Sequence, residues 1–565
     1  MDYDVILIHA PAIFDFRNKA IFPGALGSTV EHVQLAKVPI GMLGIADYLD
    51  RNGCKVIVDN LADRMIDDRE MDIEEHIKNT SAKVYGIDLH WHHHSQGAME
   101  VAKLCKRLHP DSYVVLGGLT STYFHEEIIR KYDFIDAVIR GEGEKAFLEF
   151  VRDIEKHGRI TGTPNLTYRK DNGDICVMPL MKASTSLDEF NFLRFDLLEP
   201  QTSVFNAGIM PRWSIAVCRG CVYNCVTCGG SSYAYRKYFG MEKPSFRSPG
   251  KIIEDIKKLN ENGIYRIGLY QDPRMGGEKY WRELLTALTK EDFKADMLSM
   301  DLLAPADEEY IKEIANIGKP IVLYLCPEAG SCAVRQAQGR HYSNEEILDT
   351  VNLCNKYHIP VTTFFSVGLA GETEQTMRET YDLWDKICLQ ERNRGHFGKT
   401  KRFDSVGGPI IGPIILEPGS MAYDNPEKYG YKLSFKNLEE YIEALSKPSW
   451  HQWLNHETAT WDKNALMRYI FESIEYSISQ RRKYDYYDNF QTSIEYQKLK
   501  MNMIAVGVVN GIIELDDEEE VKARLVAFKD AIDSINNTPN DTKDTYGYQS
   551  MLGQIFREKI APVSS

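Results

Sequence analysis

The 565-residue sequence lacks the features that mark membrane, nucleic-acid-binding or secreted proteins. It has no run of about 18 apolar residues, so it predicts no membrane-spanning helix. Asp and Glu (82) outnumber Lys and Arg (67), giving a net charge of −15, whereas binding to a phosphate backbone needs the opposite balance. The opening Met1-Asp-Tyr-Asp has no basic region like that of a signal peptide. We therefore expect a cytoplasmic protein with no nucleic-acid partner.

The sequence also lacks a disulfide framework. Its eleven cysteines are odd in number and mostly isolated, as is typical of a reducing compartment. A composition of 43% hydrophobic and 26% charged residues is that of an ordinary globular protein, and the length allows two or three domains.

Four cysteines depart from this scatter and gather between Cys218 and Cys228. Three of them, Cys221, Cys225 and Cys228, form a CxxxCxxC motif. Thiolates this close together can bind zinc or an iron–sulfur cluster. A structural zinc site draws ligands from two separated places, and no second Cys or His pair of that kind follows. Three cysteines from one loop favour a [4Fe–4S] cluster with one iron left open to a substrate.

On these residues the chain resembles the radical S-adenosylmethionine (SAM) enzymes. The resemblance implies that the cysteines hold the cluster and that its open iron chelates SAM. It also implies that Gly229 and Gly230 pass beside the methionine amine. Arg219-Gly220 before the motif is common in the cobalamin-binding branch of that family. Cys218 remains open between a bystander or redox-sensitive thiol and a residue with a role at the cluster.

The first 150 residues alternate short apolar runs with helical spacing, which predicts a doubly wound, Rossmann-like parallel sheet. His9-Ala-Pro-Ala follows the first predicted strand in place of G-x-G-x-x-G, so a nicotinamide cofactor is not expected. The pattern resembles the cobalamin-binding domain that precedes the barrel in one branch of radical SAM enzymes. This resemblance implies cobalamin-binding roles for residues in three segments: Pro39, Gly117, Gly118, Gly141 and Glu142.

A histidine-rich loop, His90-Trp-His-His-His94, follows the third predicted strand. Such a loop lies at the edge of the sheet where a corrin ring would bind. Three interpretations remain open. A histidine ligates cobalt, or Trp91 or a histidine such as His92 covers the lower face of the corrin without a bond, or the loop is a solvated turn.

Strand–helix units recur after Trp213 and predict a partial (β/α)6 barrel with its site at the carboxyl ends of the strands. Cys326-Pro-Glu328-Ala-Gly330-Ser331 resembles a SAM-binding segment of the family, which implies contacts to SAM from Glu328 and Arg335. Gly371, in a loop that resembles the family's "GLPGET" turn, is expected to shape the SAM site. We expect a cobalamin domain over residues 1–160, a linker over 161–205, the barrel over 206–424 and a helical cap over 425–565.

These resemblances imply a cobalamin-dependent radical SAM methyltransferase. In such enzymes the reduced cluster cleaves SAM to a 5′-deoxyadenosyl radical, and methylcobalamin then methylates an unactivated carbon. The substrate would be a small molecule or a protein or peptide side chain, such as the glutamine of methyl-coenzyme M reductase. The electron donor would be a ferredoxin or a flavodoxin.

Two alternatives stay open at this point, and no catalytic side chain is assigned. The same cofactors could serve a radical rearrangement or cyclisation without methylation. The chain could also be a non-catalytic cobalamin or metal sensor that carries a structural zinc.

Overall fold

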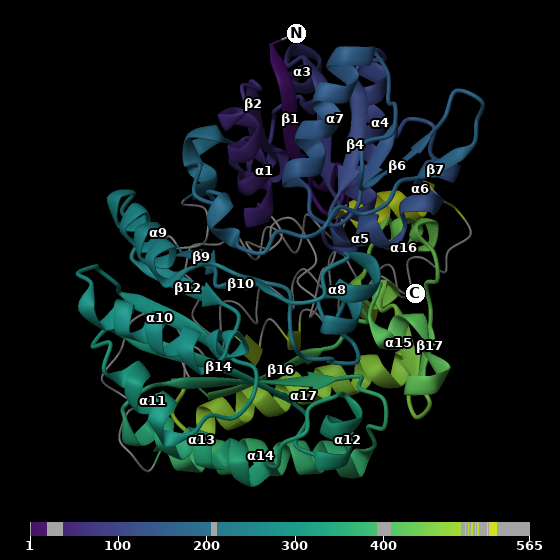
Figure 1. Ribbon diagram of the computed structural model, residues 1–565. Helices are drawn as coiled ribbons and strands as arrows, with labels where there is room; N and C mark the ends of the chain where they lie inside the picture. The colour runs from purple at the N-terminus through teal and green to yellow at the C-terminus, as the bar shows by residue number, and fades with distance from the viewer. Residues whose placement is uncertain are drawn as a thin grey trace.

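The computed structural model describes residues 2–19, 38–204, 212–392 and 408–487, together with separate positions between 492 and 527. Figure 1 shows two α/β bodies, one above the other, with the elements that follow residue 420 beside and between them. Most of the expected cap beyond residue 487 therefore lies outside the described residues.

The first body is built on one sheet with the strand order β7-β6-β5-β4-β3-β1-β2-β8. Its inner strands are parallel, as the alternating pattern predicts. The strands are β1 (Tyr3–His9), β2 (Val56–Asn60), β3 (Ala82–Asp88), β4 (Tyr113–Gly117), β5 (Ala137–Ile139), β6 (Leu166–Arg169), β7 (Ile175–Val177) and β8 (Leu198–Glu199).

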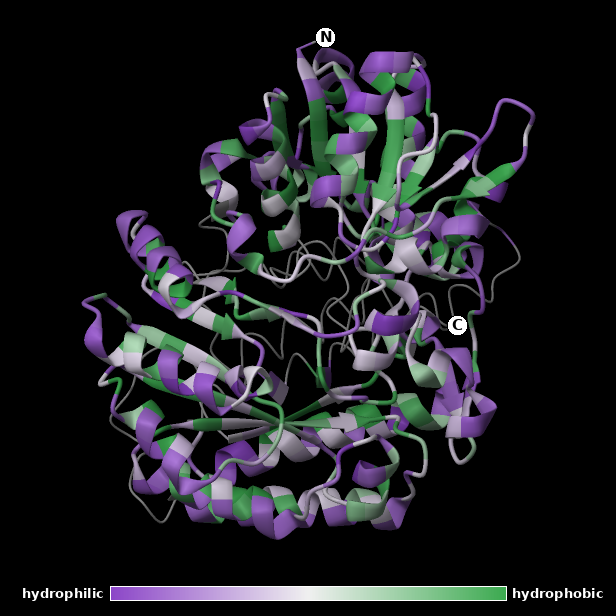
Figure 2. Ribbon diagram, in the orientation of Figure 1, coloured by the Kyte–Doolittle hydropathy of each residue, from purple (hydrophilic) through white to green (hydrophobic). Residues whose placement is uncertain are grey.

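Helices cover both faces of this sheet, because successive side chains of a strand point to opposite faces. Along β1, Leu7 packs with α1 and α7 in one core, whereas Ile8 packs with α3 and α4 in another. Figure 2 shows hydrophobic strands between helices of mixed hydropathy. The helices are α1 (Ile40–Arg51), α2 (Leu61–Asp67), α3 (Ile73–Asn79), α4 (Ser95–Leu108), α5 (Leu119–Tyr123), α6 (His125–Lys131) and α7 (Glu144–His157). The predicted doubly wound sheet is confirmed.

The segment expected as a linker does more than connect the two bodies. Strands β6 and β7 add to one edge of the first sheet as antiparallel neighbours of β5. Strand β8 pairs with β2 at the opposite edge. Residues 166–199 therefore complete the first sheet at both sides.

The second body is a six-stranded parallel sheet in the order β16-β15-β14-β13-β12-β9, which confirms the predicted partial barrel. Its strands are β9 (Arg212–Ala216), β12 (Arg266–Tyr270), β13 (Met297–Leu302), β14 (Ile321–Glu328), β15 (Val361–Val367) and β16 (Gly408–Pro413). Helices α9 (Pro249–Glu261), α10 (Glu278–Lys290), α11 (Glu308–Ala315), α13 (Asn344–Lys356) and α14 (Glu374–Arg392) connect them. The sequence sets these helix starts locally: Ser343 and Glu346 form a capping box at α13.

Elements after residue 420 join the two bodies. Helix α16 (Leu438–Leu445) packs against α4 of the first body, and α17 (Lys463–Lys483) packs against β16 of the second. The tryptophans at 450, 453 and 461 are buried in one core with α17, so these three residues serve packing. In the described part of the chain, no helix has the length and apolar character needed to cross a membrane.

Candidate functional site

The CxxxCxxC motif lies in a loop that leads from a short ribbon, β10 (Cys218–Arg219) paired with β11 (Ser245–Phe246), into α8 (Ser232–Tyr238). Backbone hydrogen bonds fix this loop on two sides. Val226 N–H donates to the Gln338 carbonyl (3.1 Å), and Ala422 N–H donates to the Val226 carbonyl (2.9 Å). The loop is therefore held between the end of α12 (Cys332–Ala337) and the start of α15 (Met421–Asp424).

The three motif thiols have the environment of metal ligands. Backbone N–H groups of Tyr223 and Gly230 donate to the sulfurs of Cys221 (3.4 Å) and Cys228 (3.3 Å). Such donors are common around cluster thiolates. Burial raises the pKa of Cys221 and of Cys225, so these thiols stay neutral unless a metal stabilises the thiolate.

The motif suits a cluster better than a single ion. A structural zinc ion takes four protein ligands, whereas this loop supplies three thiols. Three cysteines from one loop can hold a [4Fe–4S] group and leave one of its irons open. Cys218 lies outside the loop on β10, buried, and burial raises the pKa of its thiol above the usual range. Its position favours the bystander interpretation.

The structure separates the two predicted SAM contacts at the end of β14. Glu328 closes the strand, with its carboxylate 2.6 Å from Ser366 Oγ and 2.7 Å from Arg340 Nη2. Arg335 is fully buried in α12, where its guanidinium donates to Asn344 Oδ1 (2.7 Å). The guanidinium that pairs with Glu328 therefore belongs to Arg340.

Sequence reasoning missed Arg340 because Arg335 stands at the expected spacing. One feature of the sequence could have indicated Arg340: the glycine before it, Gly339, which follows α12. Gly339 has a φ of +84°, and this turn of the chain brings Arg340 toward the cysteine loop. Burial raises the pKa of Cys225, and the positive charge of Arg340 opposes that effect, so the two groups are neighbours.

The predicted glycines line the same region from other sides. A Cβ added at Gly229 would lie 2.9 Å from Glu417 Cβ, so this glycine allows the cysteine loop to pack on the segment after β16. Gly371 lies in the loop after β15. That loop holds a residue that the sequence did not single out: the buried Glu372 accepts hydrogen bonds from the N–H groups of Gly368 (2.7 Å) and Leu369 (3.0 Å). Burial raises the pKa of Glu372 to about 8.

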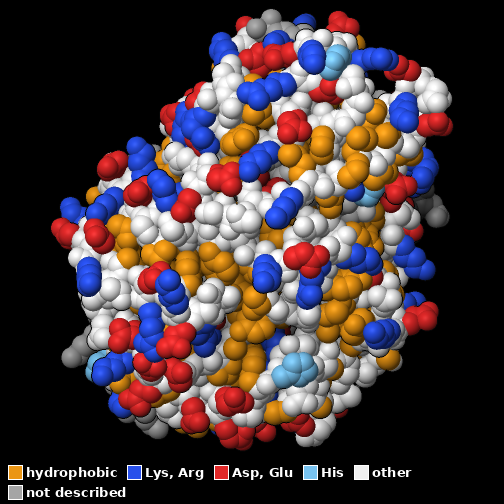
Figure 3. Space-filling model, in the orientation of Figure 1, with side chains coloured by type: hydrophobic (Ala, Val, Ile, Leu, Met, Phe, Trp, Pro, Cys, Tyr) orange, Lys and Arg blue, Asp and Glu red, His pale blue; other side chains and the backbone are white. Residues whose placement is uncertain are grey.

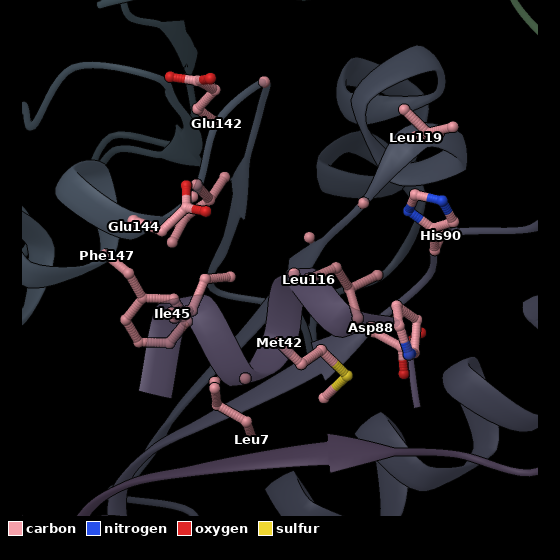
Figure 4. A pocket seen from close by; sticks show the side chains of 18 of the residues that line it. Leu7, Met42, Ile45, Asp88, His90, Leu116, Leu119, Glu142, Glu144 and Phe147 are labelled. Atoms are coloured by element: carbon pink, nitrogen blue, oxygen red, sulfur yellow. The ribbon is translucent and has the colours of Figure 1, made fainter. Parts of the chain in front are cut away.

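A cavity of about 190 Å³ opens at the carboxyl ends of the first sheet (Figure 4). Five of the predicted cobalamin residues line it: Pro39, Gly117, Gly118, Gly141 and Glu142. The close-up shows Leu7 and Met42 at one end of the cavity, with Ile45 and Phe147 along one side and Leu116 and Leu119 along the other. The space is thus a mostly apolar slot between the sheet and α1.

The glycines of this slot leave room for a ligand. A Cβ built on Gly117 would have its nearest neighbour, the Ile139 carbonyl oxygen, 3.9 Å away, so it would project into open space of the cavity. Gly118 has a φ of +113°, and a Cβ there would come within 2.7 Å of the His90 backbone. The fold family implies a bound cobalamin. A narrow apolar slot lined by glycines fits the nucleotide tail of that cofactor.

The histidine loop divides between this cavity and the second body. His90 lines the cavity, whereas Trp91 and His92 do not. The ring of His92 lies tilted against Tyr441 of α16, with ring centroids 5.0 Å apart, and its Nδ1 lies 3.4 Å from Glu417 Oε2. Trp91 packs edge-on to His90 with ring centroids 4.8 Å apart.

Arg219 connects the cysteine loop to the cavity. Its guanidinium lies 3.0 Å from Glu142 and 2.5 Å from Glu144, and all three side chains line the cavity. Arg219 is two residues from Cys221, so the wall of the candidate cobalamin cavity continues through this one residue toward the candidate cluster loop. Sequence analysis pointed to Arg219 and to Glu142 independently. It could not predict that they form an ion pair, because the pair depends on how the two bodies pack.

Comparisons with known proteins find two family models in the chain. Residues 215–383 match the radical SAM superfamily. Residues 29–151 match the B12 binding domain. The two matches fall on the second and first bodies, respectively.

Individual proteins are also similar to this chain. An uncharacterized methyltransferase, PH0819 of Pyrococcus horikoshii, is 26% identical over 62% of this chain and 74% of its own length. The anaerobic magnesium-protoporphyrin IX monomethyl ester cyclase of Rubrivivax gelatinosus is 24% identical, and the match spans about half (51%) of each protein. The structure of the radical SAM methyltransferase TsrM from Kitasatospora setae, with cobalamin and a [4Fe–4S] cluster bound, superposes with a TM-score of 0.57 at 15% identity. It covers 89% of this chain and 100% of TsrM.

Proposed function

Because the chain belongs to the family of cobalamin-dependent radical SAM methyltransferases, we propose that it transfers a methyl group to an unactivated carbon of its substrate. The wall at Arg219 is the observation that carries this proposal. A methyl transfer of this kind requires the methyl donor beside the place where the substrate radical forms. Arg219 supports this arrangement, because it lines the cavity and lies two residues before Cys221.

When bound, the cluster with SAM supplies the radical that activates a C–H bond, and cobalamin supplies the methyl group. The protein's own residues hold and orient these groups. Cys221, Cys225 and Cys228 anchor the cluster, and the ion pair of Glu328 with Arg340 presents a carboxylate and a guanidinium to SAM. No side chain needs to act as an acid or base in this scheme.

The proposed substrate is a carbon of a protein or peptide side chain. The mouth of the barrel offers a surface for such a substrate: Tyr270, at the end of β12, is 57% exposed, and Val222, in the cysteine loop, is 47% exposed. In Figure 3 hydrophobic side chains gather between the two bodies and over the strands of the second sheet. Exposed apolar side chains beside the cysteine loop can contact a substrate that binds there. A ferredoxin or flavodoxin is the proposed reductant.

The test is an anaerobic reaction of the reconstituted protein with SAM, a reductant and a candidate protein, followed by mass spectrometry. A gain of one methyl group on the protein, with formation of 5′-deoxyadenosine and S-adenosylhomocysteine, supports the proposal. Arg219→Met should bind SAM normally and yet lose methyl transfer, because it breaks this wall and leaves Glu144 buried without its partner.

A second function, radical cyclisation with the same cofactors, is favoured by the similarity to the cyclase of Rubrivivax gelatinosus. S-adenosylhomocysteine separates the two functions, because only methyl transfer must produce it. Turnover that yields 5′-deoxyadenosine and a modified product without S-adenosylhomocysteine would favour cyclisation.

A further inference from the structure

Three buried side chains with metal-binding groups meet where β1 and β3 end. His9 is the last residue of β1, Asp88 is the last residue of β3, and His94 lies in the turn before α4. The two strands are adjacent, with Ile8 opposite Ile87. One ligand atom from each of the three side chains lies within 4.8 Å of the other two. All three are buried: His9 and His94 are 0% exposed and Asp88 is 7% exposed.

The hydrogen bonds inside this cluster leave three buried atoms unsatisfied. His9 Nδ1 lies 2.8 Å from Asp88 Oδ1. Among the described residues, Asp88 Oδ2 and both ring nitrogens of His94 have no hydrogen-bond partner. The ring of His94 is 5.0 Å from that of His9, so its unsatisfied nitrogens lie beside the pair. A buried polar atom without a partner destabilises the folded protein, and such atoms are rare in native proteins.

We propose that His9, Asp88 and His94 bind a divalent transition-metal ion, with Zn²⁺ as the reference ion. Two imidazoles and one carboxylate are a recurrent ligand set for zinc and for ferrous iron. One ion would bond to Asp88 Oδ2 and to a nitrogen of His94. It would therefore give a partner to two buried side chains that have unsatisfied polar atoms. No sulfur belongs to this set, which distinguishes the site chemically from the cysteine loop.

Such an ion would position the wall of the cobalamin cavity. Asp88 and His90 both line that cavity, and His90 is the fourth residue before His94. Without the ion, the His9–Asp88 hydrogen bond connects the two strands, but within the part of the chain that the structure describes no hydrogen bond of the His94 ring connects them to the histidine loop. The ion would make that connection and would fix His90 relative to the ends of β1 and β3.

The neighbouring histidines supply a matched control. His93 is adjacent in sequence but stacks on His92 at 4.0 Å and lies outside the metal-binding group. His93→Gln therefore changes the same loop by the same chemistry without removing a proposed ligand.

The experiment uses the full-length protein with its cluster assembled and cobalamin bound, so that the cysteines are occupied. The protein is freed of loosely bound metal, dialysed against Zn²⁺ alone and analysed for zinc per chain. We expect one zinc in the wild type and in His93→Gln, and less than about a tenth of that in His94→Gln. Asp88→Asn retains an oxygen that can accept from His9 and should weaken zinc binding by more than the ten- to hundredfold that loss of an outer-shell partner causes.

X-ray absorption at the zinc edge of the wild type gives a readout that does not depend on any variant folding. A shell of nitrogen and oxygen that includes two imidazoles supports the proposal. A wild type that retains no zinc, a shell that contains sulfur, or equal zinc in His94→Gln and His93→Gln would each overturn it. None of these readouts depends on catalytic turnover.

Discussion

At the scale of single residues, Arg340 carries the clearest consequence for SAM binding. It pairs with Glu328 at 2.7 Å beside the cysteine loop. We expect Arg340→Met to weaken SAM binding by about ten- to a hundredfold, since a charge-assisted hydrogen bond contributes roughly 1.5–3 kcal/mol. Equilibrium binding of SAM to the cluster-loaded protein measures this change.

The matched variant is Arg335→Met, at the position that the sequence favoured. Arg335 is fully buried and donates a hydrogen bond to Asn344. Its replacement should therefore lower the melting temperature and leave SAM affinity within a few-fold of the wild type. The reverse pattern, in which only Arg335→Met weakens SAM binding, would contradict the assignment.

Glu372 predicts a pH dependence of stability. Its folded pKa of about 8 lies above its ordinary value of 4.5, because burial disfavours the charged form. Between those values the unfolded chain loses the proton that the folded protein keeps, so stability falls as pH rises, by at most about 1.4 kcal/mol per pH unit. Glu372→Gln cannot ionise, so it removes this pH-dependent loss of stability. The difference in melting temperature between Glu372→Gln and the wild type should therefore shift in favour of the variant as pH rises from about 5 to about 8.

Glu242→Gln, at an exposed position, is the control for this comparison. It should track the wild type at every pH. If Glu372→Gln also tracks the wild type, the Glu372 carboxyl is ionised in the folded protein and the expectation is wrong.

Prediction from sequence succeeded at this scale where a residue is recognisable by its local neighbours. The cysteines and Glu328 are embedded in short motifs, whereas Arg340 meets Glu328 only after the chain beyond α12 has folded back onto β14. Arg335 shows the physical limit: its spacing fits the motif, but α12 points the side chain inward onto Asn344.

At the scale of elements, Gly339 determines how α12 meets the cysteine loop. It has a φ of +84°, and an added Cβ would lie 2.5 Å from the Asn224 carbonyl oxygen. Gly263 also has a positive φ (+75°) but has open space around its Cβ position. Gly263→Ala should therefore cost only the conformational penalty of about 1–2 kcal/mol.

Gly339→Ala should cost more and should also displace the cysteine loop. We expect less iron per chain after cluster assembly in Gly339→Ala and normal iron in Gly263→Ala, measured by iron analysis and visible absorbance. Equal iron in the two variants would show that the loop adapts without loss of the cluster.

The inner strands were the elements that the sequence predicted best. β13 and β15 belong to the recurring strand–helix units that the sequence predicts after Trp213, and both are largely buried between their helices. The short edge strands β6 to β8 all lie in the segment expected as a linker. Local alternation indicates two of them, β6 and β7, but their pairing with the first sheet depends on partner strands that local sequence does not reveal.

At the scale of the whole molecule, the two bodies have separate sheets, so loss of the cluster should not unfold the cobalamin domain. Replacing Cys221, Cys225 and Cys228 together with Ala should leave a folded protein without iron that still binds cobalamin. Circular dichroism, iron analysis and retention of cobalamin on gel filtration check the three parts. Cluster absorbance and SAM cleavage that survive the replacement would refute the cysteine assignment.

The wall at Arg219 makes the loading of the two cofactors a linked equilibrium. A ligand in the cavity touches a side chain that is two residues from Cys221, so each cofactor biases the loop that receives the other. Thermodynamic reciprocity then requires that the factor by which cluster assembly raises cobalamin affinity equals the factor by which cobalamin raises cluster affinity. Each 1.4 kcal/mol of this coupling corresponds to tenfold. Whichever cofactor is already bound, the affinity of the second is therefore changed by the same factor.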